Sequence, residues 1–273
     1  MNGSNVNYLT NKVVMVTGAA RGIGAAVAEN MARAGAATIA ITDIDVDVGE
    51  KFAAQLNDRY AVEVLFFPMD VTDELAWSEV VGKVVTAAGG LDILVNNAGI
   101  EIANLIENYS YSDYKKQMSV NSDGVFLGCR EAIRAMKPGG QAGKGGSIVN
   151  LSSIAGFIGL PGFSVYGGAK GFVRLISKHL AVECAKLGYG IRVNSVHPGL
   201  IETDMGNQVC EHFVAMGLAE TLEEATQAVE SSTPMGKLGN VDEVAAAVTY
   251  LASDSASYVT GAELAVDGGW AAS

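Results

Sequence analysis

The sequence has little positive charge and few cysteines. Lys and Arg number 18 against 30 Asp and Glu, which gives a formal net charge of −12 over 273 residues. Nucleic-acid-binding proteins usually carry a basic face, so this balance argues against a nucleic-acid partner. The three cysteines, Cys129, Cys184 and Cys210, form no close pair. They predict neither a disulfide framework nor a metal site, and they indicate a reducing compartment.

Long apolar runs are also missing. No stretch approaches the roughly 18 apolar residues of a membrane span, and residues 1–12 lack the apolar core of a signal peptide. We therefore expect a cytoplasmic protein without membrane association. Apolar residues nevertheless make up 49% of the chain, enough for a large core. We expect residues 1–273 to form a single domain.

Short apolar runs and helical patterns alternate along almost the whole chain. The runs predict seven strands, at 13–16, 38–41, 62–67, 93–95, 148–151, 191–196 and 263–266. Helical segments are expected between them, including 74–88, 113–136 and 164–187. Repeated strand–helix–strand units predict a seven-stranded parallel sheet with helices on both faces. Right-handed crossovers make this a doubly wound, Rossmann-type α/β domain.

Polar residues and glycines follow the predicted strands. In doubly wound sheets, ligands bind beyond the carboxyl ends of the strands. The residues at these ends are therefore expected to meet in one crevice: Gly18, Asp43, Asp70, Asn97, Ser153 and Pro198. The glycine-rich segment 138–146 precedes a strand, so we expect a surface loop at the opposite edge of the sheet.

A glycine-rich turn follows the first predicted strand and opens the first helix. Residues 17–24 read Thr-Gly-Ala-Ala-Arg-Gly-Ile-Gly. Glycines let a backbone approach a pyrophosphate closely, and a helix N-terminus offers free N–H groups. The turn therefore predicts a dinucleotide site. Asp43, about 20 residues on, is placed to accept hydrogen bonds from ribose hydroxyls and to repel a 2′-phosphate, which favours NAD. Arg21 could bind that phosphate and leaves NADP as the alternative.

At this point the chain resembles the classical short-chain dehydrogenase/reductase family over residues 11–270. The motifs that carry the resemblance occur in the family's order: 17–24, 69–71, 96–99, 119–121, 147–153, Tyr166 with Lys170, 197–203, and 260–269. One run departs from the family's Tyr-x-Ala-Ser-Lys, because here Gly168 and Ala169 precede the lysine. We expect a small effect on helix packing or stability and no loss of activity.

The resemblance implies a role for each matching position. It places Asp70 and Val71 at the adenine ring, 97–99 along the cofactor, and Ile201 and Thr203 at the nicotinamide carboxamide. The predicted cofactor-binding residues are Gly18, Arg21, Gly22, Ile23, Gly24, Asp43, Asp70, Val71, Asn97, Ala98, Gly99, Tyr166, Lys170, Pro198, Ile201 and Thr203. The resemblance also implies a homotetramer, and the apolar segments 125–136 and 172–185 are candidate contact faces.

The four residues that match the family's catalytic set are Asn121, Ser153, Tyr166 and Lys170. Tyr166 and Lys170 are four residues apart on a predicted helix and therefore share a face. A nearby ammonium lowers the pKa of a phenol, which suits Tyr166 for proton exchange with an alcohol or ketone oxygen. Ser153 would stabilise charge on that oxygen. The resemblance gives Asn121 a water that links Lys170 to solvent. The predicted reaction is hydride transfer between NAD(H) and a secondary alcohol or its ketone.

Substrate choice is expected to depend on a segment without strand pattern, at about 200–234. Its helically spaced side chains (Met205, Val209, Phe213 and Met216) fit either ordinary core or the lining of a substrate lid. Four further apolar residues are candidates for the pocket wall: Ile100, Ile154, Phe157 and Phe163. No Lys or Arg occurs among these positions. They predict a bulky, uncharged substrate that is steroid-like, terpenoid or aryl.

The sequence also allows two alternative functions and one further candidate residue. An NADPH-dependent 3-oxoacyl reductase would need a basic docking patch for an acidic carrier, which the net charge disfavours. A dinucleotide-binding redox sensor without turnover would not need the four catalytic positions. His197 has a candidate catalytic side chain, but a structural role is the prediction there.

Overall fold

The computed structural model describes residues 8–273. In this range, seven strands form one parallel sheet in the order β3-β2-β1-β4-β5-β6-β7, which confirms the predicted doubly wound fold. The reversal of strand order between β1 and β4 creates the switch point at which such sheets bind ligands. The strand bounds are β1 Val13–Thr17, β2 Thr38–Asp43, β3 Glu63–Pro68, β4 Ile93–Asn96, β5 Gly146–Leu151, β6 Ile191–Pro198 and β7 Glu263–Val266.

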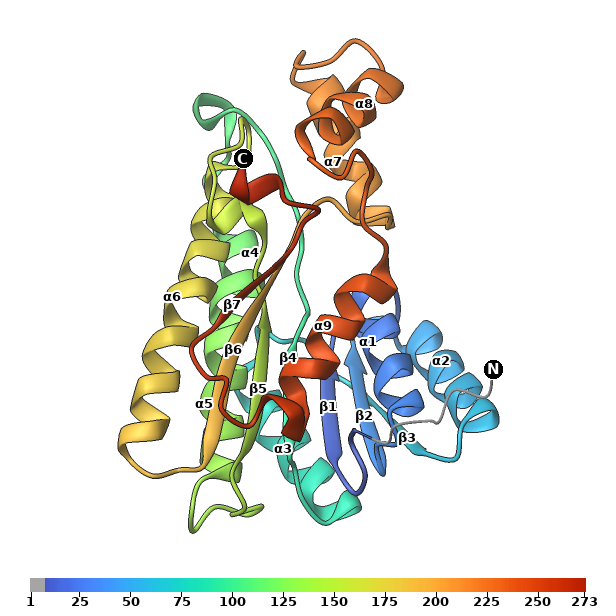
Figure 1. Cartoon of the computed structure of the whole chain (residues 1–273), viewed down its shortest axis with the longest axis vertical. Coiled ribbons are helices and arrows are strands. Elements are labelled where there is room, and N and C mark those ends of the chain that lie inside the picture. Colours follow the sequence, from blue (N-terminus) through green and yellow to red (C-terminus); the bar gives the residue numbers. More distant parts are fainter. Residues whose placement is uncertain (1–7) are drawn as a thin grey trace.

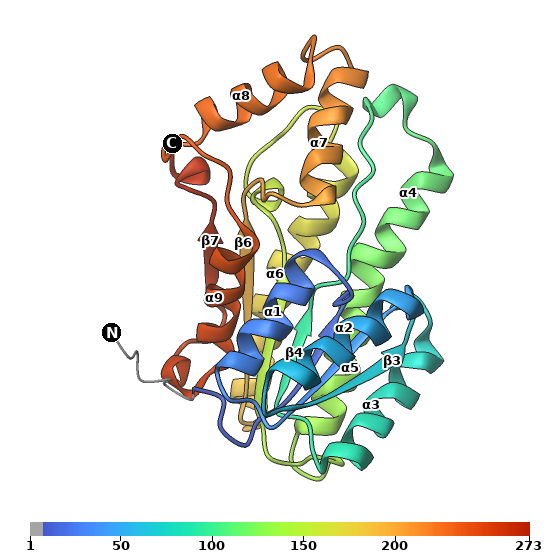
Figure 2. The ribbon, with the colours of Figure 1, turned by 90° about the vertical axis from the view of Figure 1, so that its right-hand side faces the viewer.

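Helices cover both faces of the sheet (Figure 1). One layer holds α1, α2 and α9, and the other holds α3, α5 and α6, with α4 leading into α5. Helices α7 and α8 rise beyond the carboxyl ends of the strands (Figure 2). The helix bounds are α1 Gly22–Arg33, α2 Val46–Arg59, α3 Glu74–Ala88, α4 Tyr111–Met118, α5 Gly124–Met136, α6 Ser164–Lys186, α7 Asp204–Ala215, α8 Leu222–Ser232 and α9 Val241–Ala252.

The central strands are buried on both faces, so their sequences are almost wholly apolar. In β1, Val14 and Val16 pack on the layer of α1 and α9, whereas Val13 and Met15 face the layer of α3 and α5. This alternation follows from the two-residue period of a strand. It forms two apolar cores that hold the strand ends in fixed positions.

The helix predicted at 113–136 is continuous but not uniform. Residues Ser119–Asp123 form a π turn between α4 and α5, and the backbone remains helical on both sides of it. π turns inside α-helices are rare and often lie at functional sites. This one contains Asn121, whose side chain is fully buried.

Several features away from the strand ends bear on the expectations above. Cys129, Cys184 and Cys210 are buried free thiols. Within residues 8–273, no helix combines the length and apolar character needed to cross a bilayer. The 138–146 segment leads into the amino end of β5, opposite the crevice, as expected. The cytoplasmic location stays a prediction.

Candidate active site

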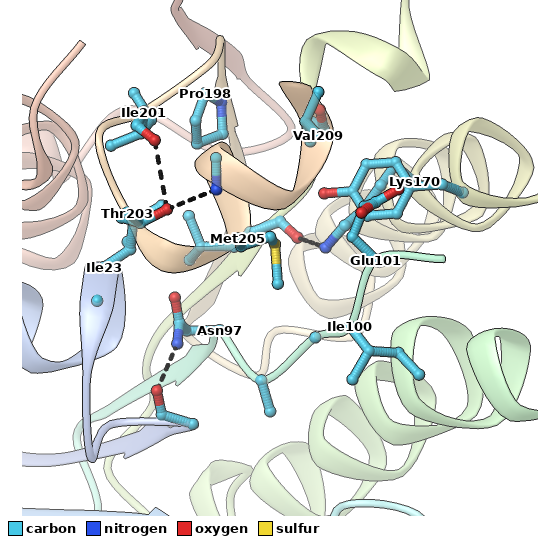
Figure 3. A pocket seen from close by; sticks show the side chains of 18 of the residues that line it. Ile23, Asn97, Ile100, Glu101, Lys170, Pro198, Ile201, Thr203, Met205 and Val209 are labelled. Carbon is cyan, nitrogen blue, oxygen red and sulfur yellow. Dashed lines mark hydrogen bonds between the residues drawn. The ribbon is translucent and has the colours of Figure 1, made fainter. Parts of the chain in front are cut away.

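A cleft of about 840 Å³ lies at the carboxyl ends of the strands. It runs from the start of α1, past the ends of β2, β4, β5 and β6, to α6 and α7. Figure 3 shows Ile23 and Thr203 on one side of it and Glu101 and Lys170 on the other. Of the eighteen predicted catalytic and cofactor-binding residues, all but Gly24 and Asn121 line this cleft. Those two lie directly behind it, as the contacts below show.

The glycine-rich turn is held closely against its neighbours. Gly18 has a φ of +61°, and a Cβ there would lie 2.7 Å from Cα of Ala98. A Cβ on Gly24 would lie 2.3 Å from the carbonyl oxygen of Gly18. No side chain caps the N-terminus of α1, where Gly22 and Ile23 begin the helix. The turn therefore forms a backbone cradle with free N–H groups, which fits a pyrophosphate.

Asn97 ties this turn to the end of β4. Its Nδ2 donates to the carbonyl oxygens of Thr17 and Gly18, each at 2.9 Å, and the bond to Gly18 is drawn in Figure 3. The backbone N–H groups of Asn97 and Ala98 both donate to Oγ1 of Thr17. The Asn97 side chain thus positions the turn, while the backbone of 97–99 lines the cleft.

Asp43 lies at the far end of the dinucleotide side. Its Oδ2 accepts from the N–H of Ala20 at 3.0 Å, and its Oδ1 accepts from the N–H of Asp45 at 3.0 Å. Each carboxylate oxygen keeps a further lone pair toward the cleft. Arg21, the residue that could bind the 2′-phosphate of NADP, forms an ion pair with Asp45. The guanidinium is therefore partly neutralised where a 2′-phosphate would need it.

The adenine and nicotinamide positions are fixed by local contacts. Asp70 accepts two hydrogen bonds from Thr72, through N–H and Oγ1. Val71 is buried against Gly124, where a Cβ would lie 2.9 Å from its Cγ2. Thr203 caps α7 by accepting from the N–H of Gly206 at 3.0 Å and donates to the carbonyl of Ile201 at 3.3 Å (Figure 3). Pro198 ends β6 beside them.

Tyr166 and Lys170 lie on one face of α6, as their spacing predicts. Lys170 is 4% exposed, and its Nζ donates to the carbonyl of Leu151 at 2.8 Å. The same Nζ lies 5.7 Å from the ring centroid of Tyr166. Gly99 lies next to this ammonium, since a Cβ there would be 3.6 Å from Nζ, an ordinary contact distance.

The expected lowering of the phenol pKa is not found. Burial and the nearby charge of Glu101 raise the pKa of Tyr166 to about 12, although a hydrogen bond with Ser153 opposes them. Burial also lowers the pKa of Lys170 to about 8. The prediction that the Lys170 ammonium lowers the phenol pKa is therefore wrong. Desolvation is the largest cause of the raised pKa, and the Lys170 ammonium donates its hydrogen bond to the backbone carbonyl of Leu151.

Ser153 and Asn121 support this pair from two other segments. Ser153 follows β5 and accepts from the N–H of Ala155 at 3.1 Å, which fixes its hydroxyl beside Tyr166. Asn121 pairs with the backbone of Ile100 in both directions, at 2.9 and 2.8 Å. Its amide thus positions the strand-end segment. The water link from Asn121 to Lys170 stays a prediction.

Three of the four apolar side chains predicted as either core or lid lining belong to the cleft. Met205, Val209 and Phe213 line the cleft, whereas Met216 lies against Gly162. The predicted pocket-wall residues Ile100, Ile154 and Phe163 also line it, and Phe163 makes edge contacts with Tyr166 and Phe213. Phe157 does not line it. That prediction was wrong, because its ring packs between His197 and Arg174.

His197 has the contacts of a structural residue. It is fully buried, its Nε2 lies 2.8 Å from Oγ of Ser195, and its Nδ1 lies 3.3 Å from the carbonyl oxygen of Ser153. A carbonyl can only accept, so Nδ1 carries the proton. Burial lowers the pKa of His197 to about 4, which keeps the ring neutral.

Comparisons with known proteins agree with this geometry. The family model described as "Enoyl-(Acyl carrier protein) reductase" matches residues 18–271. The chain is 39% identical to an NADP-dependent (R)-specific alcohol dehydrogenase of Lentilactobacillus kefiri, over 97% of this chain and 98% of that one. It belongs to the classical short-chain dehydrogenase/reductase family. The chain is therefore an oxidoreductase.

Other members of this short-chain dehydrogenase/reductase family are similar over comparable lengths. A 3-alpha-(or 20-beta)-hydroxysteroid dehydrogenase of Mycobacterium tuberculosis is 39% identical over 96% of this chain and 90% of that one. The crystal structure of an NAD+-bound xylitol dehydrogenase superposes with a TM-score of 0.90 at 31% identity, and the match covers 96% of this chain and 99% of that one.

The departure from the family's Tyr-x-Ala-Ser-Lys run has a local explanation. Gly168 faces open space and Ala169 is fully buried. Glycine at an exposed helix position costs roughly 0.5–1 kcal/mol relative to alanine. A buried alanine needs no hydrogen-bond partner, unlike a serine. Neither position reaches the proton-exchanging groups, which agrees with the expected small effect on packing.

Two residues with ionisable side chains at the cleft were not predicted. Glu101 lines the cleft immediately after Ile100, and Nδ1 of His212, on α7, lies 2.9 Å from Oε2 of Glu101. The sequence could have indicated both positions. Glu101 is two residues after the 96–99 motif, and His212 is seven residues after Met205, which places these two on one face of a helix. Trp270, near the C-terminus, lines the cleft without any comparable signal in the sequence.

Proposed function

We propose that this oxidoreductase transfers a hydride between NAD(H) and the carbinol carbon of a bulky, uncharged secondary alcohol, or the corresponding ketone. The observation that carries the proposal is the meeting of Tyr166, Ser153 and Lys170 beside a backbone cradle for a dinucleotide. The names of the Lentilactobacillus and Mycobacterium relatives, an alcohol and a hydroxysteroid dehydrogenase, support it.

Tyr166, Lys170 and Ser153 have different roles at the reacting oxygen. A bound nicotinamide supplies the hydride donor or acceptor. In reduction, Tyr166 gives its phenol proton to the forming alkoxide, and its raised pKa keeps that proton in place at neutral pH. In oxidation, the phenolate form of Tyr166 takes the hydroxyl proton and becomes the phenol, and the ammonium of Lys170 favours the phenolate that begins this step. The hydroxyl of Ser153 stabilises the developing charge on oxygen.

The charges at the end of β2 support NAD over NADP. Asp43 lines the cleft, and Asp45 follows it and forms an ion pair with Arg21. A 2′-phosphate there would meet two carboxylates and one cation that is already paired. Ribose hydroxyls would instead find acceptors on Asp43. The NADP dependence of the Lentilactobacillus relative makes a direct test necessary.

Initial rates with NADH and NADPH on neutral ketones, from small aliphatic through aryl to steroid, test the proposal. We expect kcat/KM to be at least roughly tenfold higher with NADH, a difference of about 1.4 kcal/mol, and to favour the bulkier ketones. Asp43→Asn should reduce the NADH preference, while Asp47→Asn, an exposed control on α2, should not. Turnover only with NADPH on 3-oxoacyl esters would instead establish the alternative reductase.

The outer faces of α5 and α6 support the proposed homotetramer. Phe126, Phe172, Leu175 and Val182 are between 38% and 60% exposed on these helices. Exposed apolar side chains on two helices suit contacts with further copies of the chain. Light scattering should give about four times the chain mass of 28.3 kDa. Leu175→Arg should lower that mass, and a wild-type monomer would contradict the proposal.

A further inference from the structure

Glu101 is a buried carboxylate in an otherwise largely apolar part of the cleft. Its side chain is 1% exposed and lies just beyond the end of β4. Neither of its carboxylate oxygens has a hydrogen-bond partner among the described residues. An unsatisfied buried carboxylate is costly, and native proteins rarely keep one without a use for it.

His212 lies beside Glu101 but leaves acceptor capacity of the carboxylate free. Its Nδ1 lies 2.9 Å from Oε2 of Glu101, yet its ring N–H is not aligned for a hydrogen bond. Burial raises the pKa of Glu101, and the charge of His212 opposes that rise. Oε1 has no cation beside it among residues 8–273.

The surroundings place Glu101 at the substrate end of the cleft. Its charge raises the pKa of two phenols, Tyr166 and Tyr109, so it lies near the reacting position. Figure 3 shows Glu101 and Lys170 on the same side of the pocket, across from Ile23 and Thr203, which flank the dinucleotide side. A substrate held at Tyr166 would therefore present its other groups toward Glu101.

We propose that Glu101 is a specificity residue that accepts a hydrogen bond from a second hydroxyl group of the substrate. The preferred substrates are then diols or hydroxyketones rather than the matching mono-alcohols. This inference rests on the proposed function and leaves its hydride and proton transfers unchanged. A hydroxyl suits the site because Oε1 of Glu101 has free acceptor capacity, whereas an anionic group would be repelled by the carboxylate.

The test compares cyclohexanol with its 1,2-, 1,3- and 1,4-diols, using NAD+ and purified full-length protein. A hydrogen bond to a charged group is worth about 1.5–3 kcal/mol, or roughly 10- to 100-fold. We expect the best diol to exceed cyclohexanol by at least tenfold in kcat/KM, mainly through KM. Glu101→Leu should reduce this ratio to about one, and Glu101→Gln should give an intermediate ratio. Glu107→Gln, an exposed carboxylate outside the cleft, is the matched control and should keep the wild-type ratio.

The outcomes separate this inference from the proposed function. No turnover of cyclohexanol, of its diols or of any ketone in the panel above, with either dinucleotide, would overturn the proposed function itself. Equal turnover of mono-alcohol and diols by the wild type would overturn only the role of Glu101. An unchanged diol preference in Glu101→Gln would overturn it as well, even if Glu101→Leu fails to fold. Preference for 4-aminocyclohexanol over every diol would show that Glu101 binds a cation and would also reject the inference.

Discussion

The two ends of the cleft are built in different ways. The dinucleotide end consists mainly of backbone, with glycines packed closely against neighbouring segments and free N–H groups at the start of α1. The side chains of Asn97 and Asp43 hold this turn in place by hydrogen bonds. The substrate end is made largely of side chains from α7, together with the buried carboxylate of Glu101 and the partly exposed His212 beside it. The close backbone packing of the first end leaves little room for substitution. The second can change with a few substitutions while the chemistry stays in place.

Tyr166→Phe tests the boundary between the two ends and should have the largest effect. Loss of the phenol proton should lower kcat by roughly 10³-fold, since general acid–base groups contribute about 10²–10⁴-fold. Dinucleotide affinity, measured by NADH fluorescence, should stay within about twofold of the wild type, because the cradle does not involve the hydroxyl. Retained kcat would remove Tyr166 from the mechanism.

Gly24→Ala tests how tightly the dinucleotide end is packed. A Cβ at position 24 would lie 2.3 Å from the Gly18 carbonyl and 2.5 Å from Nδ2 of Asn97. Overpacking of this kind costs about 1–3 kcal/mol, so dinucleotide affinity should fall roughly tenfold or more. Gly82→Ala is the control, because α3 leaves open space there and the change should stabilise slightly. Unaltered affinity in Gly24→Ala would show that the turn adapts.

The pH dependence of stability tests the support behind Ser153, outside both ends of the cleft. His197 has a pKa of about 4 when folded and about 6.5 when unfolded, so the unfolded chain binds more protons between these values. The free energy of unfolding should therefore fall as pH drops from 6.5 to 4, by roughly 2–3 kcal/mol from this residue. Urea titrations should show a shallower fall for His197→Gln. The same slope in both proteins would contradict this assignment.

The difference between the two ends also explains what the sequence could predict. Strand order, the glycine-rich turn and the pairing of Tyr166 with Lys170 depend on local periodicity and spacing, which are visible in one dimension. The raised pKa of Tyr166 depends on burial and on Glu101, which reaches it only through the fold. Phe157 was misplaced for the same reason, since its partner His197 is 40 residues away along the chain. The spacing within α7 indicated which residues share a face but not that this face lines the cleft.

The π turn at Ser119–Asp123 has a consequence for helical phase. Each residue of an α-helix advances the direction of its side chains by about 100°. The wider turn changes the rotation about the helix axis between α4 and α5. Side chains of α5 therefore point in other directions than they would if the helix were regular throughout. Deleting one residue there would rotate Asn121 away from Ile100 or turn α5 out of its core. The relative rotation of α4 and α5 thus depends on the number of residues in the turn. A substitution leaves this number unchanged, whereas any single insertion or deletion alters it.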